Sequence, residues 1–355
     1  GLGFFPAAYA DTEELVELGK IIADANAIFV IQERVFNIDR SSTGDGVAEV
    51  LEVGRRSGAK MHLAHFFVRP SGAGGTNEIS GRRLDINALS NRLIKKIDLA
   101  RSEGVDITFD AYPYPSGSTT PTCRLPGWFV DGGTEKVLKR LDNKSERARL
   151  VSYLSNRHGN EIGDVIWSYI GSDDNKMLEG MSWRDAANQR GESVLEMMCN
   201  VMLEEKLNCG LVVAPPKSTV DWQTIESGIA ALLERSDYMI GSDTIPIGEY
   251  CHPRAFGTFP RLLGRLRRRL GIPLEQLVQR MTSKGAERFG ISKRGVLKPG
   301  NFADVVVFDA DQINDLATYE DPRAYPVGIE FVTVNGCVAV DQGQCTGILA
   351  GEAVP

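Results

Sequence analysis

The sequence contains no apolar run that approaches the roughly 20 residues needed to cross a membrane. It has no C-x-x-C pair, and its six cysteines are scattered, at Cys123, Cys199, Cys209, Cys251, Cys337 and Cys345. This usage favours reduced thiols and a cytoplasmic location. A net charge of −7 gives no indication of a nucleic-acid partner. The chain starts at Gly1 rather than Met, so the absence of a signal peptide carries no information.

The composition is that of an ordinary globular protein, with 42% apolar and 25% charged residues among 355. Within the first 111 residues, predicted helices and strands alternate three times. Asp11 and Glu14 form a capping pair for the first helix. The predicted strands are Ala27–Ile31, Met61–Ala64 and Val105–Phe109, each preceded by apolar residues at helical spacing. This βαβ alternation predicts a parallel sheet or barrel.

Residues 115–236 break this rhythm. They contain a predicted helix over Ser182–Glu205 and two short apolar runs, Val165–Ile170 and Leu211–Ala214. We interpret this stretch as partly an insertion over the mouth of a barrel, which Tyr238–Ile240 resumes. From Gly295 the chain becomes rich in short strands, and Asn335-Gly336 between two of them predicts a hairpin.

A basic cluster, Arg261–Arg269, has leucines at helical spacing. It predicts a helix with one apolar face and one solvated basic face. A site for phosphate or an acidic ligand is the alternative.

One acid, Asp243, directly follows the predicted strand Tyr238–Ile240. In a parallel sheet or barrel, the carboxyl ends of the strands are where chemistry takes place. A helix cap or a turn would explain the same residue equally well.

Histidine is scarce, with four residues in the chain: His62, His65, His158 and His252. His62 and His65 are predicted to share one strand, and their spacing of three puts them on opposite faces. One of them could ligate a metal, and a hydrogen-bonded core histidine is the alternative. His252 precedes Pro253, where rim contact with a substrate and a structural turn are both open.

Three further polar residues lie near predicted strand ends. The hydroxyls of Tyr112 and Ser118 could orient an amide or a carboxylate, unless the tyrosine packs in a proline turn. Arg254 could pair with a substrate carboxylate or form a structural salt bridge.

Several long motifs, in order, resemble the D-aminoacylases, which are the N-acyl-D-amino-acid deacylases of the amidohydrolase superfamily. They are GLGFFPAAYADTEELVELGKII, MHLAHF, FDAYPYPSGSTT, LEGMSWRDAANQRGESVLEMMCNVMLEE, GSDTIPIGEYCHPRAFGTFPR and MTSKGAERFGISKRGVLKPGNFADVVVFDADQI. The resemblance implies an α/β fold: the C-terminal half of a (β/α)₈ TIM-type barrel with an insertion at about 115–236, over 1–294, and a small β domain over 295–355.

The same resemblance implies a metal-dependent hydrolase of N-acyl-D-amino acids. Asp243 would transfer protons, His65 would ligate zinc, and Tyr112, Ser118, Arg254 and His252 would contact the substrate. Zinc would lower the pKa of a bound water and polarise the acyl carbonyl. Hydrolysis of cyclic amides or other C–N bonds, and a homologue without catalysis, are the alternatives.

The sequence departs from the family at several points. It contains no H-x-H motif, Gln32 stands where the family has a zinc-binding histidine, and Phe67 replaces a lysine. An amide oxygen is a poor zinc ligand. The family's early barrel strands have no counterpart here, so we expect the partner of this chain to be a missing N-terminal half of the barrel or a second copy.

Overall fold

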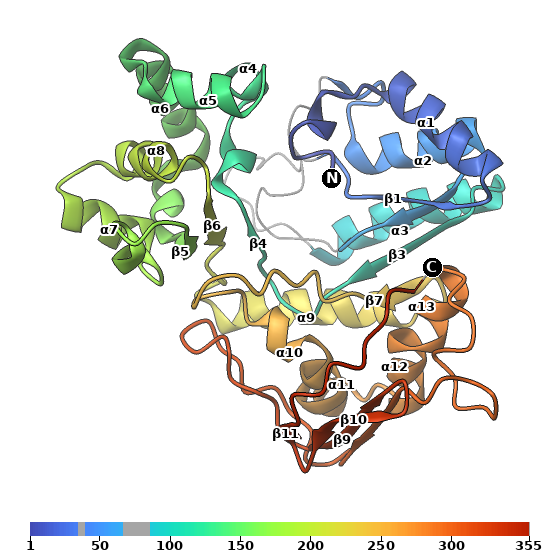
Figure 1. The fold of residues 1–355 in the computed structure, drawn as a ribbon. Coiled ribbons are helices and arrows are strands. Elements are labelled where there is room, and N and C mark those ends of the chain that lie inside the picture. Colours follow the sequence, from blue (N-terminus) through green and yellow to red (C-terminus); the bar gives the residue numbers. More distant parts are fainter. Residues whose placement is uncertain (35–39, 67–85, 355) are drawn as a thin grey trace.

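The computed structural model describes residues 1–34, 40–66 and 86–354 (Figure 1). Its centre is a four-stranded parallel sheet in the order β1-β2-β3-β7. These strands are β1 (Ile28–Ile31), β2 (Lys60–Leu63), β3 (Ile107–Ala111) and β7 (Tyr238–Ile240). The predicted parallel α/β sheet is confirmed, and it is consistent with part of a TIM-type barrel. All four strands end at one edge, so residues that follow them are neighbours.

Helix α1 (Thr12–Asp24) precedes β1, helix α2 (Gly46–Ser57) lies between β1 and β2, and helix α3 (Ile86–Ser102) lies between β2 and β3. A short 3-10 helix, Ala7–Tyr9, precedes them. The Asp11 side chain accepts a hydrogen bond from the Glu14 backbone, so the predicted cap is confirmed. Apolar faces of these helices and the strands share one core, which includes Leu15, Val50, Leu63, Ile97 and Phe109.

The middle of the chain forms a separate lobe with its own core, in green in Figure 1. A three-stranded antiparallel sheet lies in it, in the order β4-β6-β5. The strands are β4 (Ser118–Thr119), β5 (Ile166–Ile170) and β6 (Cys209–Val212). The helices are α4 (Gly127–Val130), α5 (Thr134–Asp142), α6 (Lys144–His158), α7 (Trp183–Arg190) and α8 (Val194–Glu204). Short 3-10 helices cover Pro121–Arg124, Gly159–Asp164 and Lys176–Leu178.

The single helix predicted over Ser182–Glu205 is wrong, because the chain forms α7 and α8 there. Gly191 ends α7 in the left-handed conformation, with φ +66°, and Ser193 starts α8 by accepting a hydrogen bond from the Glu196 backbone. Ser182 caps the start of α7, with its hydroxyl accepting a hydrogen bond from the Asp185 backbone.

Helix α9 (Thr219–Leu233) lies within the stretch predicted as an insertion, yet it packs on the parallel sheet. Ile225, Ile229, Leu232 and Leu233 contribute to the core of that sheet rather than to the middle lobe. The separate core therefore ends near Leu211, well before residue 236.

The C-terminal residues form an antiparallel sheet in the order β11-β10-β9-β8. The strands are β8 (Val305–Phe308), β9 (Ile329–Val334), β10 (Cys337–Asp341) and β11 (Gln344–Cys345). The predicted hairpin is confirmed, since Asn335 and Gly336 join β9 to β10 with φ of +50° and +82°.

The basic cluster spans the end of α10 (Arg254–Arg261), a π-helix (Leu262–Leu266) and α11 (Arg267–Leu270). The leucines are buried and Arg265, Arg268 and Arg269 are exposed, as predicted, but the arginines also make specific contacts. Arg267 and Arg268 donate to the carbonyls of Ala310 and Ile313, and Arg265 pairs with Asp315. These contacts hold the chain after β8 against the helix, so the cluster has a structural role. Helices α12 (Leu274–Met281) and α13 (Ser283–Arg288) complete this part.

Within the described ranges, no helix is both long enough and apolar enough to span a bilayer.

Candidate active site

Asp243 lies just past the C-terminal end of β7 and has a positive φ of +47°. Gly241 makes this approach possible, because a Cβ there would lie 2.9 Å from Cγ of Asp110 on the neighbouring β3. The Asp243 carboxylate is 37% exposed. The strand therefore presents this acid at the edge of the sheet, accessible from solvent.

The partner of Asp243 is Arg254, the first residue of α10. Arg254 Nη2 lies 2.9 Å from Asp243 Oδ2, although the arginine side chain is only 1% exposed. Its guanidinium carbon lies 4.5 Å from the ring centre of Tyr112, a cation–π contact. Nη2 also donates to the Ser118 backbone carbonyl at 3.4 Å. The structure thus brings together four predicted site residues, but Ser118 takes part through its backbone and not its hydroxyl.

His65 follows β2 rather than lying on it. The strand ends at Leu63, and His65 occupies a turn with φ +40°. The expectation that His62 and His65 share one strand is therefore wrong. The His65 backbone N–H donates to Asp110 Oδ1 at 2.7 Å, which holds this turn at the end of the sheet. The His65 ring is partly exposed and its centre lies 6.5 Å from that of Tyr112.

His62 is a core histidine, 1% exposed. Its Nδ1 lies 2.7 Å from Thr108 Oγ1, and its Nε2 lies 3.1 Å from Asp110 Oδ2. Asp110 therefore contacts both histidines, and sequence reasoning missed it. The signal was present, because Asp110 is an acid at the end of β3, as Asp243 is at the end of β7.

Gln32 directly follows β1, so it also lies at the carboxyl edge of the sheet. It is half-buried, and its backbone carbonyl accepts from the Leu2 N–H at 3.1 Å. A Cβ on Gly1 would lie 2.6 Å from Gln32 Oε1, so the side chain lies against the first residue. Phe67, the other departure from the family, lies outside the described residues.

The donors at this edge fall short of a zinc site. Zinc in proteins takes about three protein ligands of nitrogen, sulfur or carboxylate type. Among the residues that the structure describes, no group of three or more His, Cys, Asp or Glu side chains could hold a metal ion. His65 and Asp243 would supply two such donors, and Gln32 only an amide.

His252 is buried, only 1% exposed. Its Nδ1 accepts a hydrogen bond from the Arg254 backbone N–H at 3.0 Å. Pro253, the N-cap residue of α10, provides no side-chain cap. His252 therefore stabilises the start of the helix that carries Arg254.

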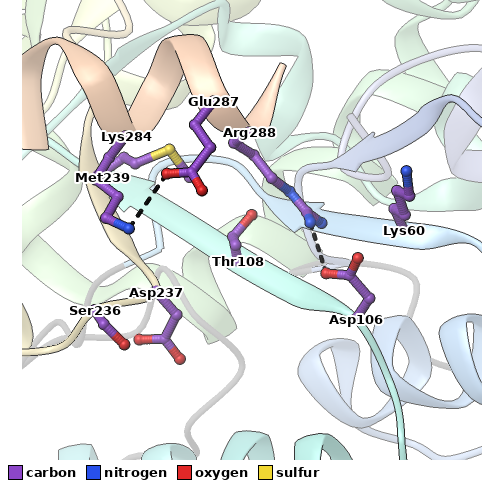
Figure 2. A pocket seen from close by; sticks show the side chains of 9 residues that line it. All are labelled: Lys60, Asp106, Thr108, Ser236, Asp237, Met239, Lys284, Glu287 and Arg288. Atoms are coloured by element: carbon purple, nitrogen blue, oxygen red, sulfur yellow. Dashed lines mark hydrogen bonds and ion pairs between the residues drawn. The ribbon is translucent and has the colours of Figure 1, made fainter. Parts of the chain in front are cut away.

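A separate cavity of about 320 Å³ lies at the opposite ends of the strands (Figure 2). Lys60, Asp106 and Asp237, at or before the starts of β2, β3 and β7, line it together with residues of α13. Its charges balance: Arg288 pairs with Asp106 at 2.6 Å and Lys284 with Glu287 at 3.4 Å. Residues at this face of a barrel serve stability, so the cavity is not the candidate site.

Comparisons with known proteins show which family the chain resembles. Residues 179–340 match the pattern of the amidohydrolase family. The chain is 29% identical over 348 residues to N-acyl-D-glutamate deacylase of Alcaligenes xylosoxydans xylosoxydans, covering 96% of this chain and 57% of that protein. It is also 29% identical over 355 residues to D-aminoacylase of the same organism, covering all of this chain and 60% of the relative.

Solved structures give the same result. N-acyl-D-glutamate deacylase of Bordetella bronchiseptica, complexed with zinc and a phosphonate inhibitor, superposes with a TM-score of 0.68 at 28% identity, covering 99% of this chain and 62% of that one. A crystal structure of D-aminoacylase has a TM-score of 0.70 at 27% identity, covering 100% and 61%. The chain thus spans about three fifths of the length of these relatives. By the order of its motifs, its parallel sheet and its C-terminal antiparallel sheet, the chain is similar to the amidohydrolase family, and within it to the D-aminoacylases.

Proposed function

We propose that the whole protein is a metal-dependent amide hydrolase that deacylates N-acyl-D-amino acids. One observation carries the proposal: an exposed carboxylate, Asp243, at the carboxyl end of a parallel strand, is paired at 2.9 Å with the buried guanidinium of Arg254. The pair places an acid–base group beside a cation that can bind a substrate carboxylate.

Two residues of this chain would have separate roles in the reaction. Asp243 would accept the proton of the attacking water and return it to the leaving amine. Arg254 would bind the carboxylate of the substrate, with Tyr112 beneath its guanidinium. Its Nε–H is buried and has no hydrogen-bond partner in the described part of the chain, so the cation retains donor capacity for a ligand.

The metal of the proposed reaction cannot be held by the described residues alone. At least one further ligand, beyond His65 and Asp243, would have to come from outside them. Two alternatives remain: hydrolysis of cyclic amides or other C–N bonds, and a homologue that binds ligand without catalysis. The amide at Gln32 favours the second of these.

We also propose that the parallel sheet pairs with further strands or with a second copy. β1 and β7 are its outer strands, and no other described strand pairs with their free edges. Unpaired edges of a sheet are open to association with other strands.

A substrate panel tests the proposed function. The natural full-length protein, supplied with zinc, is expected to release amino acid from N-acetyl-D-glutamate, N-acetyl-D-aspartate or an apolar N-acetyl-D-amino acid, and not from the L-enantiomers. Ring opening of cyclic imides alone would support the first alternative. Ligand binding without turnover of any member would support the second.

Gln32→His is expected to raise zinc occupancy in the same protein, because borderline-soft zinc prefers an imidazole nitrogen to an amide oxygen. His65→Ala is expected to lower occupancy. Elemental analysis after mild chelation measures both, with Gln32→Asn as the matched control that keeps an amide. Equal zinc in all forms would mean that neither position touches the metal.

A further inference from the structure

Two hydroxyl groups, from the buried Ser116 and the partly buried Tyr319, lie beside Nε2 of His252, the ring nitrogen that does not contact Arg254. Tyr319 Oη lies 3.2 Å from His252 Nε2, and Ser116 Oγ lies 2.7 Å from Tyr319 Oη. Ser116 Oγ is also 3.5 Å from His252 Nε2. The two residues come from opposite parts of the chain, since Ser116 follows β3 and Tyr319 lies between β8 and β9.

The hydrogen bonds assign the protons. His252 Nδ1 accepts from the Arg254 backbone, so in the neutral ring the proton is on Nε2. Nε2–H then donates to Tyr319 Oη, and Tyr319 and Ser116 share a hydrogen bond in which either hydroxyl can donate. Burial raises the pKa of Tyr319 well above its usual range, so this hydroxyl keeps its proton.

Ring contacts hold His252 in this orientation. The rings of Tyr114 and Tyr319 meet it edge-on, with centre distances of 5.3 and 5.1 Å. A rotated or flipped imidazole would lose the hydrogen bond to the Arg254 backbone, which lies at the first turn of α10.

Nearby buried ion pairs and a ring contact fix the position of Tyr319. Four residues before it, the buried Asp315 lies 3.3 Å from Arg261, and Arg261 pairs with Glu226 of α9 at 2.5 Å. The Tyr319 ring also meets the Trp222 ring edge-on at 6.3 Å. The C-terminal segment is thus tied by buried charges to the helices that surround the site.

We infer that Tyr319, supported by Ser116, is a positioning residue for substrate binding. It selects the His252 tautomer that accepts the Arg254 N–H, and it thereby holds the Arg254 guanidinium where a substrate carboxylate would bind. The inference rests on the proposed function, in which Arg254 is the carboxylate-binding cation.

Tyr319→Phe in the full-length protein tests this. The variant keeps the ring and removes the nearer acceptor for Nε2–H. We expect the KM for N-acetyl-D-glutamate to rise about fivefold to tenfold, as for the loss of one hydrogen bond, with kcat within about twofold. Tyr325→Phe is the matched control, because Tyr325 lies on the same segment, is 67% exposed and meets the Phe256 ring in an edge-to-face contact. His252→Asn, which keeps a side-chain acceptor, should bind better than His252→Leu.

An NMR measurement tests this inference independently of the proposed function. In protein with ¹⁵N-labelled histidine, the His252 resonances should report an unprotonated Nδ1 and a protonated Nε2, and Tyr319→Phe should shift them. If Tyr319→Phe does not fold, Ser116→Ala takes its place in both measurements. A protonated Nδ1 in the wild type, or a KM no higher than that of Tyr325→Phe, would overturn the inference. Wild-type protein with the expected resonances but no turnover would instead refute the proposed function.

Discussion

Asp243→Asn is expected to lower kcat by about 100-fold to 10,000-fold in the active full-length protein, the range for loss of a general acid–base group. An amide cannot accept the proton of the attacking water. Its oxygen can still accept a hydrogen bond from Arg254, which lies 2.9 Å from the carboxylate. The turn at φ +47° also tolerates Asn, so the fold should persist. Steady-state kinetics with an N-acyl-D-amino acid measure the loss.

Ser242→Ala is the control for disturbance of the same turn. It changes a neighbouring side chain of similar size and leaves the carboxylate in place. Circular dichroism and thermal unfolding should be alike for the wild type and both variants. A kcat of Asp243→Asn close to that of the wild type would remove Asp243 from the reaction.

Arg34→Met is expected to destabilise the fold by about 3–5 kcal/mol, because it leaves a buried carboxylate without its partner. Arg34 Nε and Glu49 Oε2 lie 2.9 Å apart, and both side chains are fully buried. Arg34 also donates to the carbonyls of Ala8 at 3.0 Å and Ala10 at 2.6 Å, and Thr12 donates to Glu49 at 2.9 Å. The pair thus joins the N-terminal segment, α1 and α2. Chemical denaturation measures the change in the free energy of unfolding.

Arg56→Met is the matched control, since Arg56 pairs with Glu13 at 2.6 Å but both side chains are exposed. Exposed pairs contribute little, so this variant should unfold close to the wild type. The double variant Arg34→Met, Glu49→Leu should recover much of the loss, because it removes both buried charges. Equal stability of the two single variants would contradict the importance of burial.

Local patterns predicted much of the architecture. The strands of the parallel sheet, the Asp11 cap and the Asn335-Gly336 hairpin follow from side-chain period and turn chemistry, which act over a few residues. The break between α7 and α8 was missed, although Gly191 and Ser193 are typical stop and start residues, because the apolar spacing continues across them.

Part of the candidate site could also be predicted from the sequence, and part could not. Position after a strand was enough to predict Asp243, and family motifs added His65, Tyr112 and Arg254. Asp110 also lies at the end of a strand, but it was not among the predicted site residues. Nothing in the sequence pairs Tyr319 with His252 or Arg254 with Asp243, because these contacts form only after the elements have packed.

The sequence by itself therefore determined the order of the elements, the parallel sheet and the edge where the chemistry is expected, since each depends on neighbours along the chain. Only the tertiary structure decided that His62 belongs to the core, that the basic cluster holds the C-terminal segment, and that Arg254 is buried against an exposed acid. The reason is physical: the burial of a residue and its hydrogen-bond partners depend on residues that are far apart in the sequence. A local sequence pattern therefore does not predict them.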